Sequence, residues 1–156
     1  MLIVDIPGYA KLTLRHLVMD FNGTLACDGE LLPGVHDWLA QLPVNLEVHV
    51  LTGNTHGDAD QKLQGLPCHV ELLSATNQAD WKRDYVTYLG APQVVAIGNG
   101  RNDRLMLHAA AIGIAVIGPE GGAIGSLMTA DLVVRDIADA FDLLIHPLRM
   151  VASLRE

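Results

Sequence analysis

Polar side chains follow three apolar segments of this chain, where catalytic groups could meet. Asp20 comes near the end of the apolar run 15–21, and the glycine turn Asn22-Gly23-Thr24 follows it. A carboxylate at the end of a buried strand is costly to desolvate unless it is paired or used. The polar residues that follow the runs 15–21, 46–51 and 94–98 are Asp20, Asn22, Thr52, Asn99, Asn102 and Asp103.

This set of side chains suits phosphoryl transfer. The reaction needs an in-line nucleophile, a cation that shares the phosphoryl charge, and donors around the equatorial oxygens. Asp20 could be the nucleophile, Thr52 offers a hydroxyl and Lys82 a positive charge. Mg²⁺ prefers hard oxygen ligands. The candidate ligands are the carboxylates of Asp20 and Asp103, the backbone carbonyl of Asn22 and the side-chain oxygen of Asn99.

The elements that must position these groups alternate along the chain. Pro7-Gly8 predicts a hairpin between strands 2–6 and 11–14. The further predicted strands are 15–21, 46–51, 68–73, 94–98, 112–118 and 132–134. The predicted helices are 35–42, 56–65, 77–90, 101–110, 122–130 and 137–154, the last one broken at Pro147.

Strands that are apolar throughout and separated by helices indicate an α/β fold with a parallel sheet covered on both faces. In such a sheet, ligands bind beyond the carboxyl ends of the strands, where the strand order reverses. The candidate residues all follow strands at that edge, except Lys82, which a helix could direct toward it. We expect one domain over residues 1–156, because the connections are short and no repeat or linker is visible.

Composition narrows the functional classes. The formal net charge is -8, which argues against a nucleic-acid partner or an anionic membrane surface. The two cysteines, Cys27 and Cys68, lack metal-type spacing, and the N-terminus lacks a basic region typical of signal peptides. We therefore expect a soluble, cytoplasmic protein. The seven histidines lack paired spacing, so most are expected on the surface or in packing, and only His56, near Thr52, stands out.

Four segments occur in an order that is typical of one family. They are Asp20-Phe21-Asn22-Gly23-Thr24-Leu25 after the first core strand, Thr52 at the end of the next, Lys82 upstream of the last segment, and Gly98-Asn99-Gly100-Arg101-Asn102-Asp103. Over roughly residues 15–145 the chain resembles the haloacid dehalogenase (HAD) superfamily, and within it the soluble relatives of the P-type ATPase phosphorylation domain.

The resemblance implies a Rossmann-like three-layer αβα sandwich without a cap domain and a Mg²⁺-dependent phosphatase that acts through an aspartyl phosphate on Asp20. It makes Lys82 the phosphate-contacting cation, with Arg83 as the alternative. The expected catalytic residues are Asp20, Asn22, Thr52 and Lys82, and the expected phosphate-binding residues are Gly23, Thr52, Gly53, Lys82 and Asn102. The implied substrate is a phosphorylated small molecule or a large phosphorylated molecule, and a capless site could also be covered by a homo-oligomer.

Two positions depart from the family pattern. Asn22 stands where the phosphatases have an acid that protonates the leaving oxygen and activates water, and an amide cannot do this. Asn99 stands where the family has a carboxylate ligand of Mg²⁺. We therefore expect slow hydrolysis and weak Mg²⁺ binding. A regulatory module that binds Mg²⁺ and phosphate without turnover stays open as the alternative. A receiver-type phospho-acceptor domain is disfavoured, because receivers carry an acid pair after the first strand.

Overall fold

The computed structural model describes residues 1–53, 59–74 and 76–156. Its centre is a six-stranded sheet with the order β10-β9-β8-β3-β6-β7, and every neighbouring pair is parallel. The strands are β3 (His16–Asp20), β6 (Glu47–Thr52), β7 (His69–Leu72), β8 (Val94–Gly98), β9 (Ile112–Val116) and β10 (Leu132–Val134). The predicted α/β fold with a parallel sheet is confirmed.

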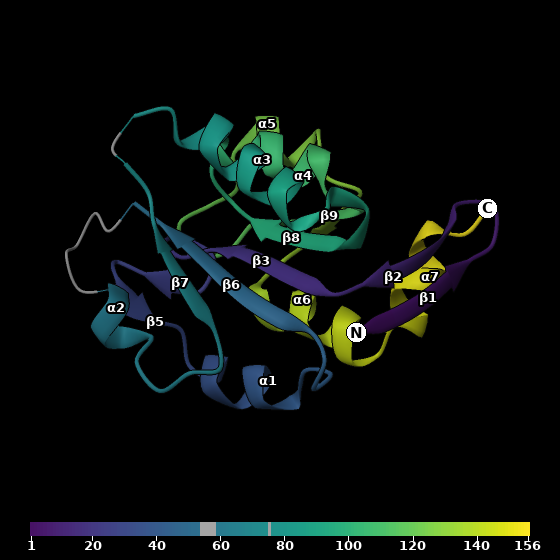
Figure 1. The fold of residues 1–156 in the computed structure, drawn as a ribbon, viewed down its shortest axis with the longest axis horizontal. Coiled ribbons are helices and arrows are strands. Elements are labelled where there is room, and N and C mark those ends of the chain that lie inside the picture. The colour runs from purple at the N-terminus through teal and green to yellow at the C-terminus, as the bar shows by residue number, and fades with distance from the viewer. Residues whose placement is uncertain (54–58, 75) are drawn as a thin grey trace.

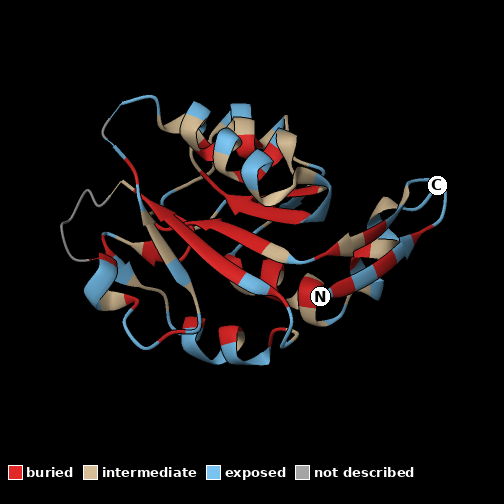
Figure 2. Cartoon of the chain, viewed as in Figure 1, coloured by how far each residue is buried: buried red, intermediate tan, exposed pale blue. Residues whose placement is uncertain are grey.

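Helices cover both faces of the sheet, so the fold has three layers (Figure 1). One face carries α3 (Gln78–Leu89), α4 (Arg104–Ala109) and α5 (Ile124–Leu127). The other carries α1 (Val35–Gln41), α6 (Ile137–Ile145) and the short α2 (Ala59–Lys62). Figure 2 shows that the inner faces of these helices and the central strands are buried, whereas the outer faces of the helices are exposed.

Alternation along the strands decides which layer each side chain meets. In β3, Leu17 and Met19 belong to the core under α1 and α6, whereas Val18 belongs to the core under α3 and α4. Successive side chains of a strand point to opposite faces. Asp20, two residues beyond Val18, therefore faces the layer of α3 and α4.

The N-terminal hairpin forms as predicted, from β1 (Leu2–Ile6) and β2 (Ala10–Leu14). It extends beyond the sheet at the right of Figure 1, where α7 (Leu148–Leu154) lies against β1. The apolar side chains on its inner face are buried in the core shared with α6 and α7, whereas Ile3 on the outer face is exposed. The hairpin therefore packs on its own chain, while self-association through other surfaces remains a prediction.

A second, smaller hairpin was not predicted. Its strands are β4 (Ala26–Cys27) and β5 (Glu30–Leu31), and its turn residues Asp28 and Gly29 have φ values of 50° and 79°. Positive φ at both central residues is typical of the tight turns that match strand twist, and Asp-Gly is a common sequence for them. The dipeptide was therefore a readable signal for this hairpin.

Several element boundaries differ from the predictions. Helix 101–110 begins as a 3₁₀ turn at Arg101–Asp103, strand 112–118 ends at Val116, and helix 122–130 is reduced to α5. Glycines at 121, 122 and 125 disfavour a longer α5 because they have low helix propensity. Part of the predicted helix 56–65, including His56, lies outside the described residues. Among the described residues, no helix has the length and apolar character needed to cross a membrane.

Candidate functional site

The predicted site residues gather at the carboxyl edge of the sheet. The chain runs from β3 outward to β6 and β7, and then returns to the other side of β3 as β8. Strand order therefore reverses next to β3, which is where α/β proteins of this kind bind ligands. Asp20 ends β3, Thr52 ends β6, and Asn99 follows β8, so three separate segments meet at this point.

A buried ion-pair cluster of Asp20, Lys82 and Asp103 forms the centre of the site. The Lys82 Nζ atom donates to Asp20 Oδ1 at 2.5 Å and to Asp103 Oδ1 at 2.6 Å. The exposed fractions of the three residues are 7% for Asp20 and 0% for Lys82 and Asp103. Lys82 reaches Asp20 because it occupies the inner face of α3, one turn before the buried Val86.

Backbone groups fix the carboxylate of Asp103. Its Oδ2 atom accepts hydrogen bonds from the backbone N–H groups of Asn99 at 3.0 Å and Gly100 at 2.8 Å. A Cβ atom at Gly98 would lie 2.5 Å from the carboxyl carbon of Asp103, so only glycine fits there. The side chain of Asp103 makes no cap hydrogen bond to α4, and its bond from Gly100 belongs to the 3₁₀ turn Arg101–Asp103 that precedes this helix.

With both carboxylates ionised, the cluster carries one excess negative charge. Burial, and then the nearby Asp103, raise the pKa of Asp20 above its usual range, and these effects outweigh the opposing effect of Lys82. Burial works to lower the pKa of Lys82, but the carboxylates of Asp103 and Asp20 outweigh it and hold that pKa above its ordinary value. Lys82 is therefore a permanent cation in the site.

Arg83, the alternative to Lys82, lies outside the cluster. Its guanidinium pairs with Asp80 at 2.8 Å and with Asp84 at 2.9 Å, and its side chain is 40% exposed. The structure thus brings Lys82, and not Arg83, to Asp20.

The side chain of Asn99 has a structural reason to be an amide. Its Nδ2 group donates to the carbonyl of Gly121 at 2.9 Å, and its Oδ1 atom accepts from the hydroxyl of Thr24 at 3.2 Å. The amide lies directly over Gly23, where a Cβ atom would come within 2.3 Å of Nδ2. A carboxylate could not donate to Gly121, so the amide joins two loops that an acid would push apart.

Asn22 differs, because its side-chain oxygen has no such role. Asn22 Oδ1 is buried and has no hydrogen-bond partner within the described part of the chain. An unsatisfied buried acceptor costs about 1–3 kcal/mol. This oxygen is therefore ready to accept from a ligand, a water or a cation that enters the site.

The predicted phosphate-binding residues Gly53 and Asn102 both lie next to the side chain of Gln78. The sequence analysis did not identify Gln78 as a site residue. Gln78 Oε1 accepts from Asn102 Nδ2 at 2.9 Å, and a Cβ atom at Gly53 would lie 2.6 Å from Gln78 Nε2. Gln78 is the first residue of α3, so its sequence position resembles an ordinary helix start. Thr52 is buried at the end of β6.

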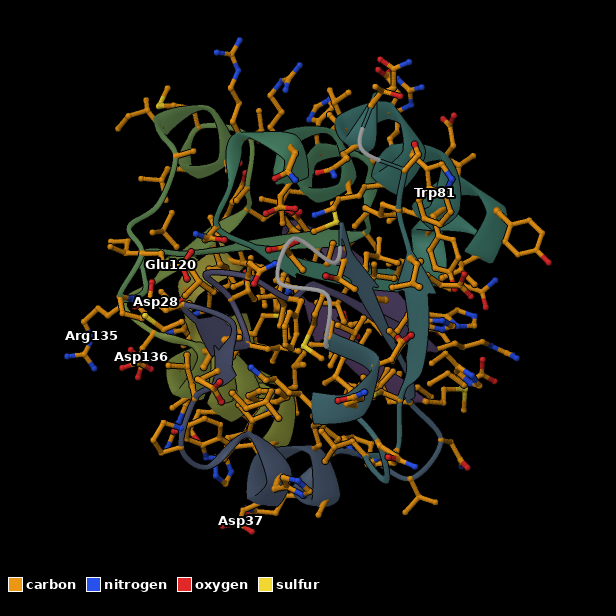
Figure 3. All side chains as sticks on the ribbon, turned by 90° about the vertical axis from the view of Figure 1, so that its left-hand side faces the viewer. Asp28, Asp37, Trp81, Glu120, Arg135 and Asp136 are labelled. Carbon is orange, nitrogen blue, oxygen red and sulfur yellow. The ribbon has the colours of Figure 1, made fainter. Side chains whose placement is uncertain are left out.

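The loops around the site also contact each other. The backbone N–H of Asp28 donates to Glu120 Oε1 at 2.8 Å, which connects the β4–β5 turn to the loop after β9. Figure 3 shows Asp28 and Glu120 side by side, with Trp81 far from them on α3.

The donor set fits Mg²⁺. The carboxylates of Asp20 and Asp103, the side-chain oxygen of Asn99 and the backbone carbonyl of Asn22 are hard oxygen donors, which is the class that Mg²⁺ prefers. Only Asp20 and Asp103 carry charge, and Lys82 neutralises one of those two charges.

Sequence comparison finds one related protein. No family model matches the chain. It is 47% identical over 64 residues to the uncharacterized protein MJ0073 of Methanocaldococcus jannaschii, a match that covers 41% of this chain and 69% of that protein. The chain belongs to the family of MJ0073. Because MJ0073 is uncharacterized, this relationship does not indicate an activity.

Solved structures identify the fold. A 3-deoxy-D-manno-octulosonate 8-phosphate phosphatase from Moraxella catarrhalis, in complex with magnesium, phosphate and KDO, superposes with a TM-score of 0.70 and 16% identity over 91% of this chain and 94% of its own. The cobalt-bound phosphatase YrbI from Haemophilus influenzae gives 0.70 and 17% over 85% and 88%. A putative HAD subfamily III A hydrolase from Legionella pneumophila gives 0.60 and 14% over 90% and 87%.

The MJ0073 family member described here thus has a HAD-like fold that resembles YrbI-type phosphatases. The expected relationship to the P-type ATPase phosphorylation domain gains no support from these structures.

Replacing Lys82 tests the buried cluster. Lys82→Met leaves two carboxylates buried without a counter-charge, so the free energy of unfolding should fall by about 3–5 kcal/mol. The matched control is Arg83→Met, which removes only exposed ion pairs and should cost less than about 1 kcal/mol. Urea unfolding of both variants measures this, and equal losses would contradict the cluster.

Replacing Asn99 separates its two expected roles. Asn99→Asp loses the donor to Gly121, so without metal the free energy of unfolding should fall by about 1–3 kcal/mol. With a third charged ligand, Mg²⁺ affinity should rise about tenfold or more. Denaturation and calorimetry measure the two effects, and unchanged Mg²⁺ affinity would show that Asn99 does not face the metal.

Proposed function

We propose that this protein is a slow Mg²⁺-dependent phosphohydrolase in which Asp20 is the nucleophile. The buried cluster of Asp20, Lys82 and Asp103 at the switch point of the sheet supports this proposal most directly. A carboxylate, a permanent cation and a second fixed carboxylate within one buried cluster are the groups that phosphoryl transfer needs. Bound Mg²⁺, held by Asp20, Asp103, Asn99 and the backbone carbonyl of Asn22, would shield the phosphoryl charge.

The residues of the chain act in two steps. A carboxylate oxygen of Asp20 forms a bond to phosphorus while the bond to the leaving oxygen breaks, and solvent protonates the released alcohol. Water then attacks the aspartyl phosphate, which returns Asp20 and releases inorganic phosphate. The Lys82 ammonium exchanges its contact with Asp20 for the incoming phosphoryl oxygens, which frees the nucleophile and neutralises developing charge.

The amide of Asn22 makes both steps slow. General acid–base catalysis typically contributes about 10²–10⁴-fold, and an amide supplies none of it. The buried Oδ1 atom of Asn22 has no hydrogen-bond partner in the residues described, which supports a role for this side chain toward a ligand. In this proposal the site keeps its nucleophile and cation but lacks its proton-transfer group.

The substrate in this proposal is a phosphorylated small molecule or a phosphate group on a larger molecule. The Moraxella catarrhalis phosphatase holds magnesium, phosphate and a sugar acid, which supports a phosphate monoester as the substrate class. Between β3 and β6, the described chain holds only the β4–β5 hairpin and α1, so nothing there encloses a substrate. The net charge of -8 disfavours nucleic acid. Self-association over the open site belongs to the same proposal.

A second candidate is a binding module that takes up Mg²⁺ and phosphate without turnover. The amides Asn22 and Asn99, at two positions where phosphatases of this superfamily carry acids, favour it. Turnover separates the two candidates, so a panel of phosphorylated metabolites should be assayed with Mg²⁺ and with EDTA.

Asp20→Asn tests the nucleophile. The substitution removes the attacking oxygen, so hydrolysis of any panel substrate should fall to the background rate and no base-labile phosphoprotein should form. The matched control is Asp5→Asn, an exposed residue of β1 that should keep full activity. Activity of Asp20→Asn close to wild type would refute the covalent mechanism.

Asn22→Asp tests the missing acid. The new carboxyl oxygen would occupy a buried position without partners, which raises its pKa and suits a general acid. Hydrolysis of alkyl phosphates should rise by up to about 10²-fold, and hydrolysis of activated aryl phosphates should rise less. Steady-state rates on both substrate types measure this. Unchanged or lower rates on both would favour the binding module.

A further inference from the structure

Two histidines and a glutamate meet at the opposite end of the sheet from the phosphate site. His16 begins β3 and Glu47 begins β6, and the two residues are partners across the parallel pair. His49 lies two residues after Glu47 and therefore on the same face. One ligand atom from each of the three side chains lies within 4.8 Å of the others. Asp20 comes four positions after His16, which is about 13 Å along a strand.

The spacing of these atoms matches a tetrahedral metal site. His16 Nδ1 lies 3.2 Å from His49 Nε2 and 3.4 Å from Glu47 Oε2. Ligands that bind zinc at about 2.0–2.2 Å in a tetrahedron are separated by about 3.3–3.6 Å. Two imidazoles and one carboxylate are also a ligand set that zinc uses when it keeps one open position.

The second ring nitrogen of His49 has a partner on α3. His49 Nδ1 lies 3.0 Å from the hydroxyl oxygen of Tyr85, and His49 Nε2 lies 3.2 Å from His16 Nδ1. In the tautomer that donates from Nδ1 to that hydroxyl, the lone pair of His49 is on Nε2 and faces His16. Metal-binding histidines usually donate their second nitrogen to such a partner.

Aromatic rings pack around His49. Its ring centroid lies 5.3 Å from that of His16 and 5.7 Å from that of Tyr85. Trp81 stacks on Tyr85 with ring centroids 5.2 Å apart and holds the phenol in place (Trp81 is labelled in Figure 3).

Solvent reaches two of the three side chains through a cavity. His16 and Glu47 line a surface cavity of 310 Å³ together with Arg15 and Asn45, whereas His49 is 5% exposed at its inner end. A metal could therefore enter from the cavity and keep a water there. Arg15 and the Met1 ammonium group, which interacts with Glu47, are unfavourable neighbours, because their charges repel a cation.

We propose that His16, Glu47 and His49 bind one divalent transition-metal ion of the zinc class, at a site separate from the phosphate site. His16 Nδ1, His49 Nε2 and a carboxylate oxygen of Glu47 are the ligands, and water completes the tetrahedron. The proton between the two ring nitrogens moves to His16 Nε2 on binding, so both lone pairs face the metal. The ion would join β3 to β6 and, through Tyr85, to α3.

Zinc titration of the metal-free chain tests this proposal without any phosphatase assay. Calorimetry should show one Zn²⁺ per chain that excess Mg²⁺ does not displace. Glu47→Gln should weaken binding at least tenfold. Loss of a partner outside the ligand shell typically lowers metal affinity 10–100-fold, and loss of a direct ligand should cost at least as much. Glu47 is exposed, so this variant should fold, and His16→Gln should give a similar loss. Arg15→Gln should bind zinc more tightly.

The controls distinguish this cluster from other histidines. His36→Gln, at an exposed position of α1, should leave the affinity unchanged. In nitrogen NMR of the wild-type protein, zinc should change the chemical shifts of His16 Nδ1 and His49 Nε2. Zinc binding that Glu47→Gln leaves intact, shifts confined to other histidines, or no binding would each overturn the proposal and leave a hydrogen-bonded packing cluster.

Discussion

One ammonium group held between two buried carboxylates organises the carboxyl edge of this sheet. Burying Asp20 and Asp103 without a counter-charge would be strongly unfavourable, so α3 must present Lys82 to both. The same requirement fixes Gly98, because any side chain there would displace Asp103. The backbone N–H groups of Asn99 and Gly100 then hold the remaining oxygen of Asp103. The local backbone and the charge arrangement thus depend on a single interaction.

Two amides in the site have different physical explanations. Asn99 connects Thr24 to Gly121, so an amide is needed there for the loops to pack, whatever it does to a metal. Asn22 has a buried oxygen that nothing else in the described chain satisfies, so its environment indicates a role toward a ligand. The resemblance to the superfamily treats both as replaced acids, whereas in the structure Asn99 has partners that require an amide and the Asn22 oxygen has none in the described residues.

Much of the fold could be predicted from the sequence, because apolar runs and glycine turns are local signals. Because ligands bind beyond the carboxyl ends of parallel strands, the sequence also predicted that Asp20, Thr52 and Asn99 lie at one edge of the sheet. Long-range partners could not be predicted in this way. Gln78 resembles an ordinary helix start until Asn102 lies beside it, and His16 and His49 are 33 residues apart in sequence. The choice between Lys82 and Arg83 likewise required the rotation of α3 about its axis.

Fluorine NMR with beryllium fluoride and Mg²⁺ tests the central claim most directly, because beryllium trifluoride on a carboxylate imitates an aspartyl phosphate. It requires neither a known substrate nor a fast second step. The account predicts bound fluoride signals that need Mg²⁺, are absent in Asp20→Asn, and persist in Asp5→Asn. Signals that persist in Asp20→Asn, or no bound signal in the wild-type protein with Mg²⁺ present, would contradict it.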